Sequence, residues 1–198
     1  INGDYAGCHL SEIWETHREL FGGCESECFP LLVKIIDAKD DLSIQVHPDD
    51  AYAKEYENGS YGKTECWYVL DCDEDGSLVI GHHAKTKEEL AEMIESGRWN
   101  DLIREIKIKK GDFIQIDPGT VHAIKGGSLI LETQQSSDLT YRLYDYDRLQ
   151  NGKPRELHLK KSMDVITVPA KDAKTSVVSA AKLPENHLNQ LYSCKYYK

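Results

Sequence analysis

The sequence is poor in cysteine, in positive charge and in long apolar runs, and each shortage argues against a class of protein. Six cysteines stand in 198 residues without a CxxC pair, too few for a disulfide scaffold. Lys and Arg number 24 against 34 Asp and Glu, a net charge of −10 that disfavours nucleic acid or an anionic membrane as partner. No apolar run approaches the ~20 residues of a membrane span. We expect reduced thiols and a cytoplasmic protein.

Short stretches rich in β-branched and aromatic residues make up most of the chain. They predict strands at 31–38, 42–46, 64–72, 77–82, 105–108, 112–116, 128–134, 139–144 and 188–197. The acidic turn at 73–76 predicts that the strands at 64–72 and 77–82 pair with each other. Helical patterns are fewer, and they predict helices at 11–21, 49–57, 86–104 and 155–165. The sequence therefore predicts a mainly β fold, a jelly-roll barrel or sandwich with a few inserted helices.

Gln45 and His47 stand two apart in the predicted strand at 42–46. Side chains two apart on a strand point to the same face. An amide oxygen and an imidazole nitrogen can therefore converge on one point, as two metal ligands would. The alternative is an ordinary solvated strand face.

Two later segments offer further ligands. Glu65 opens a strand in which Trp67 and Val69 would share its face, and a buried carboxylate needs a partner or a metal. The alternative is a glutamate on an edge strand facing water. His122 follows a strand and the turn at 117–120, an order that resembles the second motif of the cupins, in which such a His is a metal ligand inside a barrel. The alternative is a simple turn histidine.

Together Gln45, His47, Glu65 and His122 would supply two imidazoles, one carboxylate and one amide oxygen. This set suits Zn²⁺, one ion per chain. Because only one ligand is anionic, the metal would keep positive charge and could act as a Lewis acid or hold substrate oxygens.

Arg142 alternates with apolar residues and can therefore face a cleft. A guanidinium binds phosphate or enediolate oxygens well, because its donors lie in a fixed plane. The alternative is a surface arginine paired with Asp145 or Asp147.

Four runs carry a specific resemblance: LSIQVHPDD, GKTECWYVL, PGTVHAI and SSDLTYRLYDYDR, at 42–50, 62–70, 118–124 and 136–148. In this order they resemble the type I mannose-6-phosphate isomerases of the cupin superfamily, in their shorter bacterial form. The resemblance implies a zinc site made by Gln45, His47, Glu65 and His122. It also implies a catalytic Arg142 and substrate contacts from Ser43, Lys63, Asp138 and Arg142. Lys63 and Glu132 are the two candidates for the proton-carrying base.

The implied activity is a zinc-dependent aldose–ketose isomerisation between mannose 6-phosphate and fructose 6-phosphate, through a cis-enediol. The expected partner is a small sugar phosphate, with no nucleic acid or membrane, and the protein would be a monomer or weak homodimer. Some relatives carry a His directly before the Lys that matches Lys63. Here Gly62 stands in its place, which removes any ring-opening side chain from that position.

Two alternatives to the isomerase remain at this stage. One is another metal-dependent cupin enzyme such as an iron dioxygenase, which usually has three His and a Glu, so that Gln45 disfavours it. The other is a non-catalytic cupin that binds sugar phosphate.

The predicted organisation has three parts. Residues 1–168 would form the metal-binding, catalytic cupin domain, and 169–187 a linker or extended crossing segment. Residues 188–198 would be the start of a second β-domain, of which this sequence would contain only a truncated part.

Overall fold

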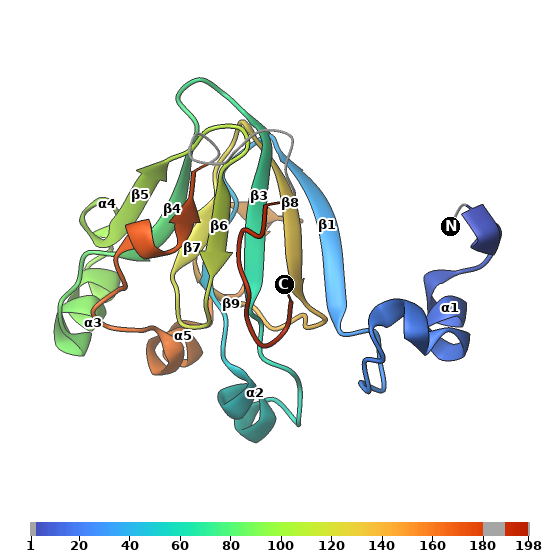
Figure 1. The fold of residues 1–198 in the computed structure, drawn as a ribbon. Coiled ribbons are helices and arrows are strands. Elements are labelled where there is room, and N and C mark those ends of the chain that lie inside the picture. The colour runs from blue at the N-terminus through green and yellow to red at the C-terminus, as the bar shows by residue number, and fades with distance from the viewer. Residues whose placement is uncertain (1–2, 180–188, 198) are drawn as a thin grey trace. The chain divides into compact units, whose positions relative to one another are not determined.

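Two five-stranded sheets dominate the protein (Figure 1). The computed structural model describes residues 3–179 and 189–197. The first sheet has the order β1 (Leu31–Ala38), β8 (Ser128–Gln135), β3 (Glu65–Cys72), β6 (Phe113–Ile116) and β12 (Val177–Val178). The second has the order β5 (Ile103–Lys107), β4 (Ser77–His82), β7 (His122–Ile124), β2 (Ile44–Val46) and β9 (Tyr141–Tyr144). This confirms the predicted mainly β, cupin-type fold.

The inner faces of the two sheets share one apolar core. Alternate residues of β3 and β4 contribute to it, since side chains two apart on a strand lie on one face. The core consists of Ala38, Trp67, Val69, Leu78, Ile80, Ile108, Ile114, Ile116, Ile124, Ile130 and Ala173. All are at most 8% exposed, so the two sheets pack face to face as in a sandwich.

Helices cover the outer face of the second sheet (Figure 1). They are α3 (Lys87–Glu95), α4 (Trp99–Leu102) and α5 (Leu159–Val165). Val79 and Ala123 on that face pack in a second core with Leu90 and Met93 of α3. Another helix, α2 (Asp50–Tyr56), follows β2 and is capped by Asp49, which accepts a hydrogen bond from Tyr52 N (2.8 Å).

The predicted pairing of the strands at 64–72 and 77–82 is wrong. β3 pairs with β6 and β8, whereas β4 pairs with β5 and β7 in the other sheet. Both strands bury large side chains in the shared core, Trp67 from β3 and Ile80 from β4. The turn at 73–76 therefore carries the chain from one sheet to the opposite one.

The predicted helix at 86–104 is shorter than expected. Thr86 caps α3 by accepting a hydrogen bond from Glu89 N (3.2 Å), but α3 ends at Glu95. Gly97 then adopts a φ of +64°, a conformation that glycine reaches without strain. After the single turn of α4, Ile103 begins β5, because this segment pairs with β4.

The C-terminal predictions also change. Within the segment predicted as a linker or extended crossing segment, residues 173–178 hold a 3-10 turn, Ala173–Thr175, and β12, which pairs with β6. Residues 180–188 lie outside the described residues. The predicted strand at 188–197 is wrong for 189–197, which contain no strand. These residues pack by side chains instead: Tyr192 stacks on Phe113, and Tyr197 Oη donates to Gln115 Oε1 (3.0 Å).

The chain divides into two compact units, Ile1–Leu31 and Leu32–Lys198. In the first unit, the predicted helix at 11–21 becomes α1 (Leu10–Thr16) and a 3-10 turn, Arg18–Phe21. Its core is a cluster of three aromatic rings, Trp14, Phe21 and Phe29, with centroids 5.0–5.7 Å apart. Such a small unit depends on these edge-to-face contacts.

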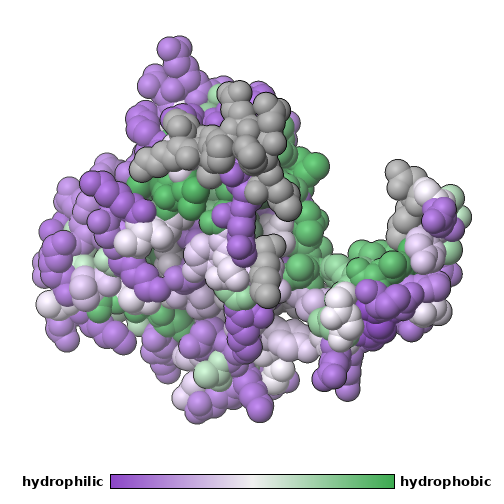
Figure 2. All heavy atoms as spheres, viewed as in Figure 1, coloured by the Kyte–Doolittle hydropathy of each residue, from purple (hydrophilic) through white to green (hydrophobic). Residues whose placement is uncertain are grey.

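The outer strand β1 exposes apolar side chains. Figure 2 shows an apolar band along β1, where Val33 is 55% and Ile35 is 70% exposed.

All six cysteines are free. In residues 3–179 and 189–197, no helix has the length and apolar character needed to span a bilayer.

Candidate metal centre and adjoining cavity

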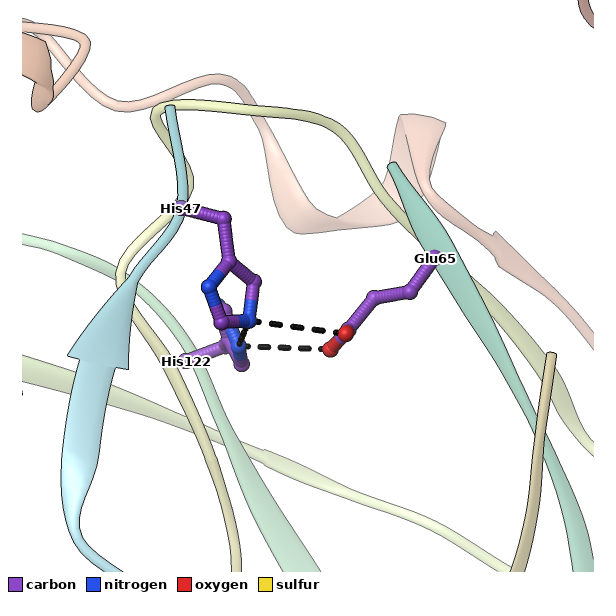
Figure 3. Close-up of side chains that lie close together, drawn as sticks. All are labelled: His47, Glu65 and His122. Atoms are coloured by element: carbon purple, nitrogen blue, oxygen red, sulfur yellow. Dashed lines mark hydrogen bonds and ion pairs between the residues drawn. The ribbon is translucent and has the colours of Figure 1, made fainter. Parts of the chain in front are cut away.

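Three buried side chains converge at one end of the space between the sheets: His47, Glu65 and His122 (Figure 3). His47 follows β2, Glu65 begins β3, and His122 begins β7. Their donor atoms all lie within 4.8 Å of one another, and none of the three side chains is more than 1% exposed. Within the described part of the chain, they form the one cluster of at least three such donors.

The nitrogen and oxygen atoms of this cluster face each other. Glu65 Oε2 lies 3.4 Å from His47 Nε2, and Glu65 Oε1 lies 3.3 Å from His122 Nε2. The two imidazole Nε2 atoms are 3.2 Å apart. His122 Nδ1 donates to Thr120 O (2.8 Å), which leaves the lone pair of Nε2 directed at the centre. The four donor atoms therefore surround one point.

Gln45 joins the cluster from the neighbouring strand. It is the cross-strand partner of His122 in the β2–β7 ladder, and its Nε2 atom lies 3.3 Å from His122 Nε2. A half-turn of the amide exchanges its nitrogen and oxygen, so the amide oxygen is within reach of the same point. The structure thus brings together all four residues predicted to be metal ligands.

The protonation of the cluster favours a cation. Burial lowers the pKa of His47 to about 4, although the Glu65 carboxylate opposes this shift. Burial alone would raise the pKa of Glu65, but the adjacent rings of His47 and His122 outweigh it and hold the pKa well below its ordinary value. At neutral pH a neutral imidazole and an ionised carboxylate are therefore available, the forms in which these groups bind metals.

The residues present fit a divalent metal ion. Both carboxylate oxygens of Glu65 are buried without a hydrogen bond, and of the two only Oε2 has a lysine close by, Lys63 at 2.9 Å. Orphaned buried polar atoms are costly, and a cation at the centre would satisfy the carboxylate. Two imidazoles, a carboxylate and an amide oxygen are a donor set for a divalent ion of intermediate softness.

A cavity of about 430 Å³ adjoins this cluster. Gln45 and Lys63 belong both to its wall and to the surroundings of the cluster. Its wall consists of Lys34, Ile36, Leu42, Ser43, Gln45, Lys63, Trp67, Ile124, Glu132, Asp138, Thr140, Arg142 and Arg155. The structure therefore gathers Ser43, Lys63, Glu132, Asp138 and Arg142, which the sequence analysis named from separate segments, on one wall.

Arg142 faces the cavity without a carboxylate partner in the described structure. Its Nη1 donates to Glu156 O (2.9 Å), and its Nε has no partner. Asp145, one of the two partners considered for it, instead binds Arg148 (2.6 Å) and Arg155 (Nε to Oδ2, 2.7 Å). Burial and the nearby Arg155 lower the pKa of Arg142. An uncompensated guanidinium in a cavity favours an anionic ligand.

Lys63 and Glu132 are both held in place. Lys63 Nζ lies 2.9 Å from Glu65 Oε2 and 3.1 Å from His47 Nε2. Glu132 accepts hydrogen bonds from Lys34 Nζ (2.9 Å) and Trp67 Nε1 (3.0 Å). The two candidate bases therefore line the same cavity, Lys63 beside the candidate metal ligands and Glu132 beside Lys34.

Two further cavity residues, Lys34 and Arg155, were not predicted from the sequence. Lys34 interrupts the otherwise apolar start of β1, Leu31–Ile36, and shares a strand face with Ile36, which also lines the cavity. A cation in an apolar strand is the signal that could have revealed it. Arg155 follows the β10 (Leu149–Gln150) and β11 (Lys153–Pro154) hairpin, and no sequence pattern links this hairpin to the cavity.

Known proteins resemble this chain in both sequence and fold. The family model "Phosphomannose isomerase type I, catalytic domain" matches residues 1–81. Mannose-6-phosphate isomerase ManA of Bacillus subtilis is 61% identical over 170 residues, 85% of this chain and 54% of that protein. Mannose-6-phosphate isomerase of Streptococcus mutans is 55% identical over 168 residues, 84% of this chain and 53% of that protein. The crystal structure of the mannose 6-phosphate isomerase from Bacillus subtilis superposes with a TM-score of 0.81 at 57% identity, covering 86% of this chain and 55% of that one.

Fold and site together define a cupin-type β protein with a candidate metal centre. Within that class, the resemblance to the type I mannose-6-phosphate isomerases is confirmed over the matched residues. The chain spans about half the length of the curated relatives it matches.

Gly62 occupies a position with no room for a side chain. A Cβ there would overlap the backbone of Asp49 and Asp50, with Asp49 Cα only 2.9 Å away. The histidine that some relatives carry before the lysine therefore does not fit this backbone.

Gly62→Ala should lower the free energy of unfolding by about 1–3 kcal/mol, as overpacking does. Urea denaturation measures this, with Ser60→Ala on the exposed part of the same loop as control. Equal midpoints for the two variants would mean that the loop moves aside freely and could accept a larger residue.

Proposed function

We propose that this protein is the catalytic part of a zinc-dependent mannose-6-phosphate isomerase, which interconverts mannose 6-phosphate and fructose 6-phosphate. The observation that supports this most is the joint position of two groups: the candidate metal ligands His47, Glu65, His122 and Gln45, and Arg142, which has no carboxylate partner in the described structure, on the cavity beside them. The relatives' names support the substrate. The free cysteines accord with the predicted cytoplasmic location.

Gln45, His47, Glu65 and His122 would hold the zinc ion. When bound, zinc supplies Lewis acidity to sugar oxygens at the end of the cavity. The remaining work falls to side chains on the wall. Arg142 would donate to the oxygen that gains negative charge as the proton leaves the carbon next to the carbonyl. This donation lowers the barrier to a cis-enediol intermediate.

A base must carry the proton between C1 and C2. We propose two candidates for this base, Lys63 and Glu132, which both line the cavity. Lys63 stands beside Glu65, near the metal end. Glu132 is oriented by Lys34 and Trp67, which fixes its carboxylate as general-base geometry requires. Ser43, Asp138 and Arg142 would bind the substrate, and the positive charge of Arg142 suits a phosphorylated sugar.

Removal of the metal should abolish the isomerase activity. We expect a coupled assay to show no turnover of mannose 6-phosphate after chelation, and recovery when Zn²⁺ is added. Glu65→Gln should lower bound zinc, measured by elemental analysis, whereas Glu105→Gln, which breaks a surface ion pair with Lys125, should not. Bound iron with no isomerisation would instead favour the dioxygenase alternative.

Arg142→Ala should lower kcat by about 10²–10³-fold, the usual effect of losing one oxyanion donor, while bound zinc remains stoichiometric. Steady-state kinetics and metal analysis on the same sample measure both quantities. The matched control is Arg98→Ala, which removes an exposed guanidinium paired with Glu92. If kcat were retained in Arg142→Ala, Arg142 would have no part in the chemistry.

A further inference from the structure

Asp50 makes contacts that its helix does not require. It is the first residue of α2, but its neighbour Asp49 already caps that helix. The Asp50 carboxylate accepts four hydrogen bonds from distant segments: from Gly62 N (3.0 Å), Gln135 Nε2 (3.0 Å), Lys195 Nζ (3.1 Å) and Tyr196 Oη (2.6 Å). A carboxylate with this many donors fixes the groups around it more than it stabilises its own helix.

The segment held by these contacts is the one that carries Lys63. Gly62 N is bound by Asp50, Lys63 N donates to Pro48 O (3.0 Å), and Thr64 N donates to Gln135 Oε1 (2.8 Å). Gln135 N in turn donates to Thr64 O (3.0 Å). Three consecutive backbone amides are thus each bound to a different partner, and the lysine between them has a fixed backbone.

Asp50 ties these partners together. Its Oδ1 atom accepts from both Gly62 N and Gln135 Nε2, so one atom links the two ends of the segment. The close approach of Gly62 to the Asp49–Asp50 backbone adds a steric constraint. Although burial acts against it, hydrogen bonds from Tyr196, Gln135 and Lys195 lower the pKa of Asp50 to about 2, so the acceptor stays ionised at neutral pH.

We propose that Asp50 is a positioning residue: through Gly62 and Gln135 it fixes the backbone of Lys63, and so aims the lysine at Glu65 and His47. Asp50 itself touches neither the metal cluster nor the cavity wall. The inference rests on the proposed function for its catalytic readout, but its structural readout is independent of that function.

The test compares Asp50→Ala, Asp50→Asn and Asp49→Ala in the zinc-loaded protein. Asp50→Ala should lower kcat for mannose 6-phosphate by about 10–100-fold, the effect expected from misplacing a reacting group. Asp50→Asn keeps an oxygen acceptor for Gly62 N and should stay within about threefold of the parent, since a neutral acceptor preserves geometry. Asp49→Ala removes only the cap, so it should lower the urea midpoint and leave kcat unchanged.

Amide hydrogen exchange supplies the second readout. In Asp50→Ala, the amides of Gly62 and Thr64 should exchange at least about tenfold faster than in the parent. Gly62 N loses its acceptor, and Gln135, which accepts from Thr64 N, loses the bond that holds its side chain. In Asp49→Ala they should be unchanged. Should Asp50→Ala not fold, Gln135→Met tests the link from Asp50 to Thr64: it removes both side-chain hydrogen bonds of Gln135, so kcat should fall and Thr64 should exchange faster, while Gly62 keeps its bond to Asp50.

Two results would overturn the proposal: unchanged exchange at Gly62 in Asp50→Ala, or a kcat of Asp50→Asn as low as that of Asp50→Ala. A parent protein that binds zinc but does not turn over mannose 6-phosphate would refute the proposed function alone. The exchange of Gly62 and Thr64 would then still decide whether Asp50 holds the segment.

Discussion

The fully buried carboxylate of Glu65 is the constraint around which this protein is built. It has no exposed surface, its nearest partners are Lys63 and the rings of His47 and His122, and its pKa lies well below the ordinary value, so it stays ionised. Burying an ion costs several kcal/mol unless opposite charge lies close by. Lys63 at 2.9 Å meets part of this requirement, and the two imidazoles leave the centre open to a cation. The local structure is therefore understandable as the shell of a metal ion.

Strand register explains why the functional groups meet. Gln45 lies between His122 on one side and Arg142 on the other in the second sheet. Trp67 lies opposite Glu132 in the first sheet. Directly opposed residues point to the same face of a sheet, so two metal donors and the guanidinium form one row. A slip of the strand pairing by one residue would turn these three side chains toward the opposite face of the sheet, where the helices pack. The site and the fold therefore depend on the same strand pairing.

Much of the fold and site could be predicted from the sequence, because both depend on local patterns. The strand limits at 31–38 and 77–82 match β1 and β4, and the period of two places Gln45 and His47 on one side. Partner choice could not be predicted. A strand such as β3, with Trp67 buried in the core, has the same pattern whether its neighbour is β4 or β8.

The missed residues have the same cause. Lys34 and Arg155 reach the cavity only because β1 pairs beside β8 and because Arg155 reaches Asp145 after the β10–β11 hairpin. The local sequence around each residue gives no sign of these contacts, apart from the charge of Lys34 among apolar neighbours. The predicted helix at 86–104 is an error of the opposite kind, because here a local pattern was trusted too far. The helical spacing of apolar residues continues past Gly97, but the structure ends α3 at Glu95 and pairs β5 with β4.

Gly62 links the loop geometry to the chemistry. The backbone of Asp49 and Asp50 fills the space that a side chain would need there, so the residue before Lys63 can contribute no side chain to the cavity. No histidine lines the cavity within the described residues. Under the proposed function, Lys63, Glu132 and Asp138 on the cavity wall are candidate proton donors for opening the sugar ring. Since Lys63 and Glu132 are also the candidates for transfer between C1 and C2, one wall would serve both steps, and its fixed geometry matters twice.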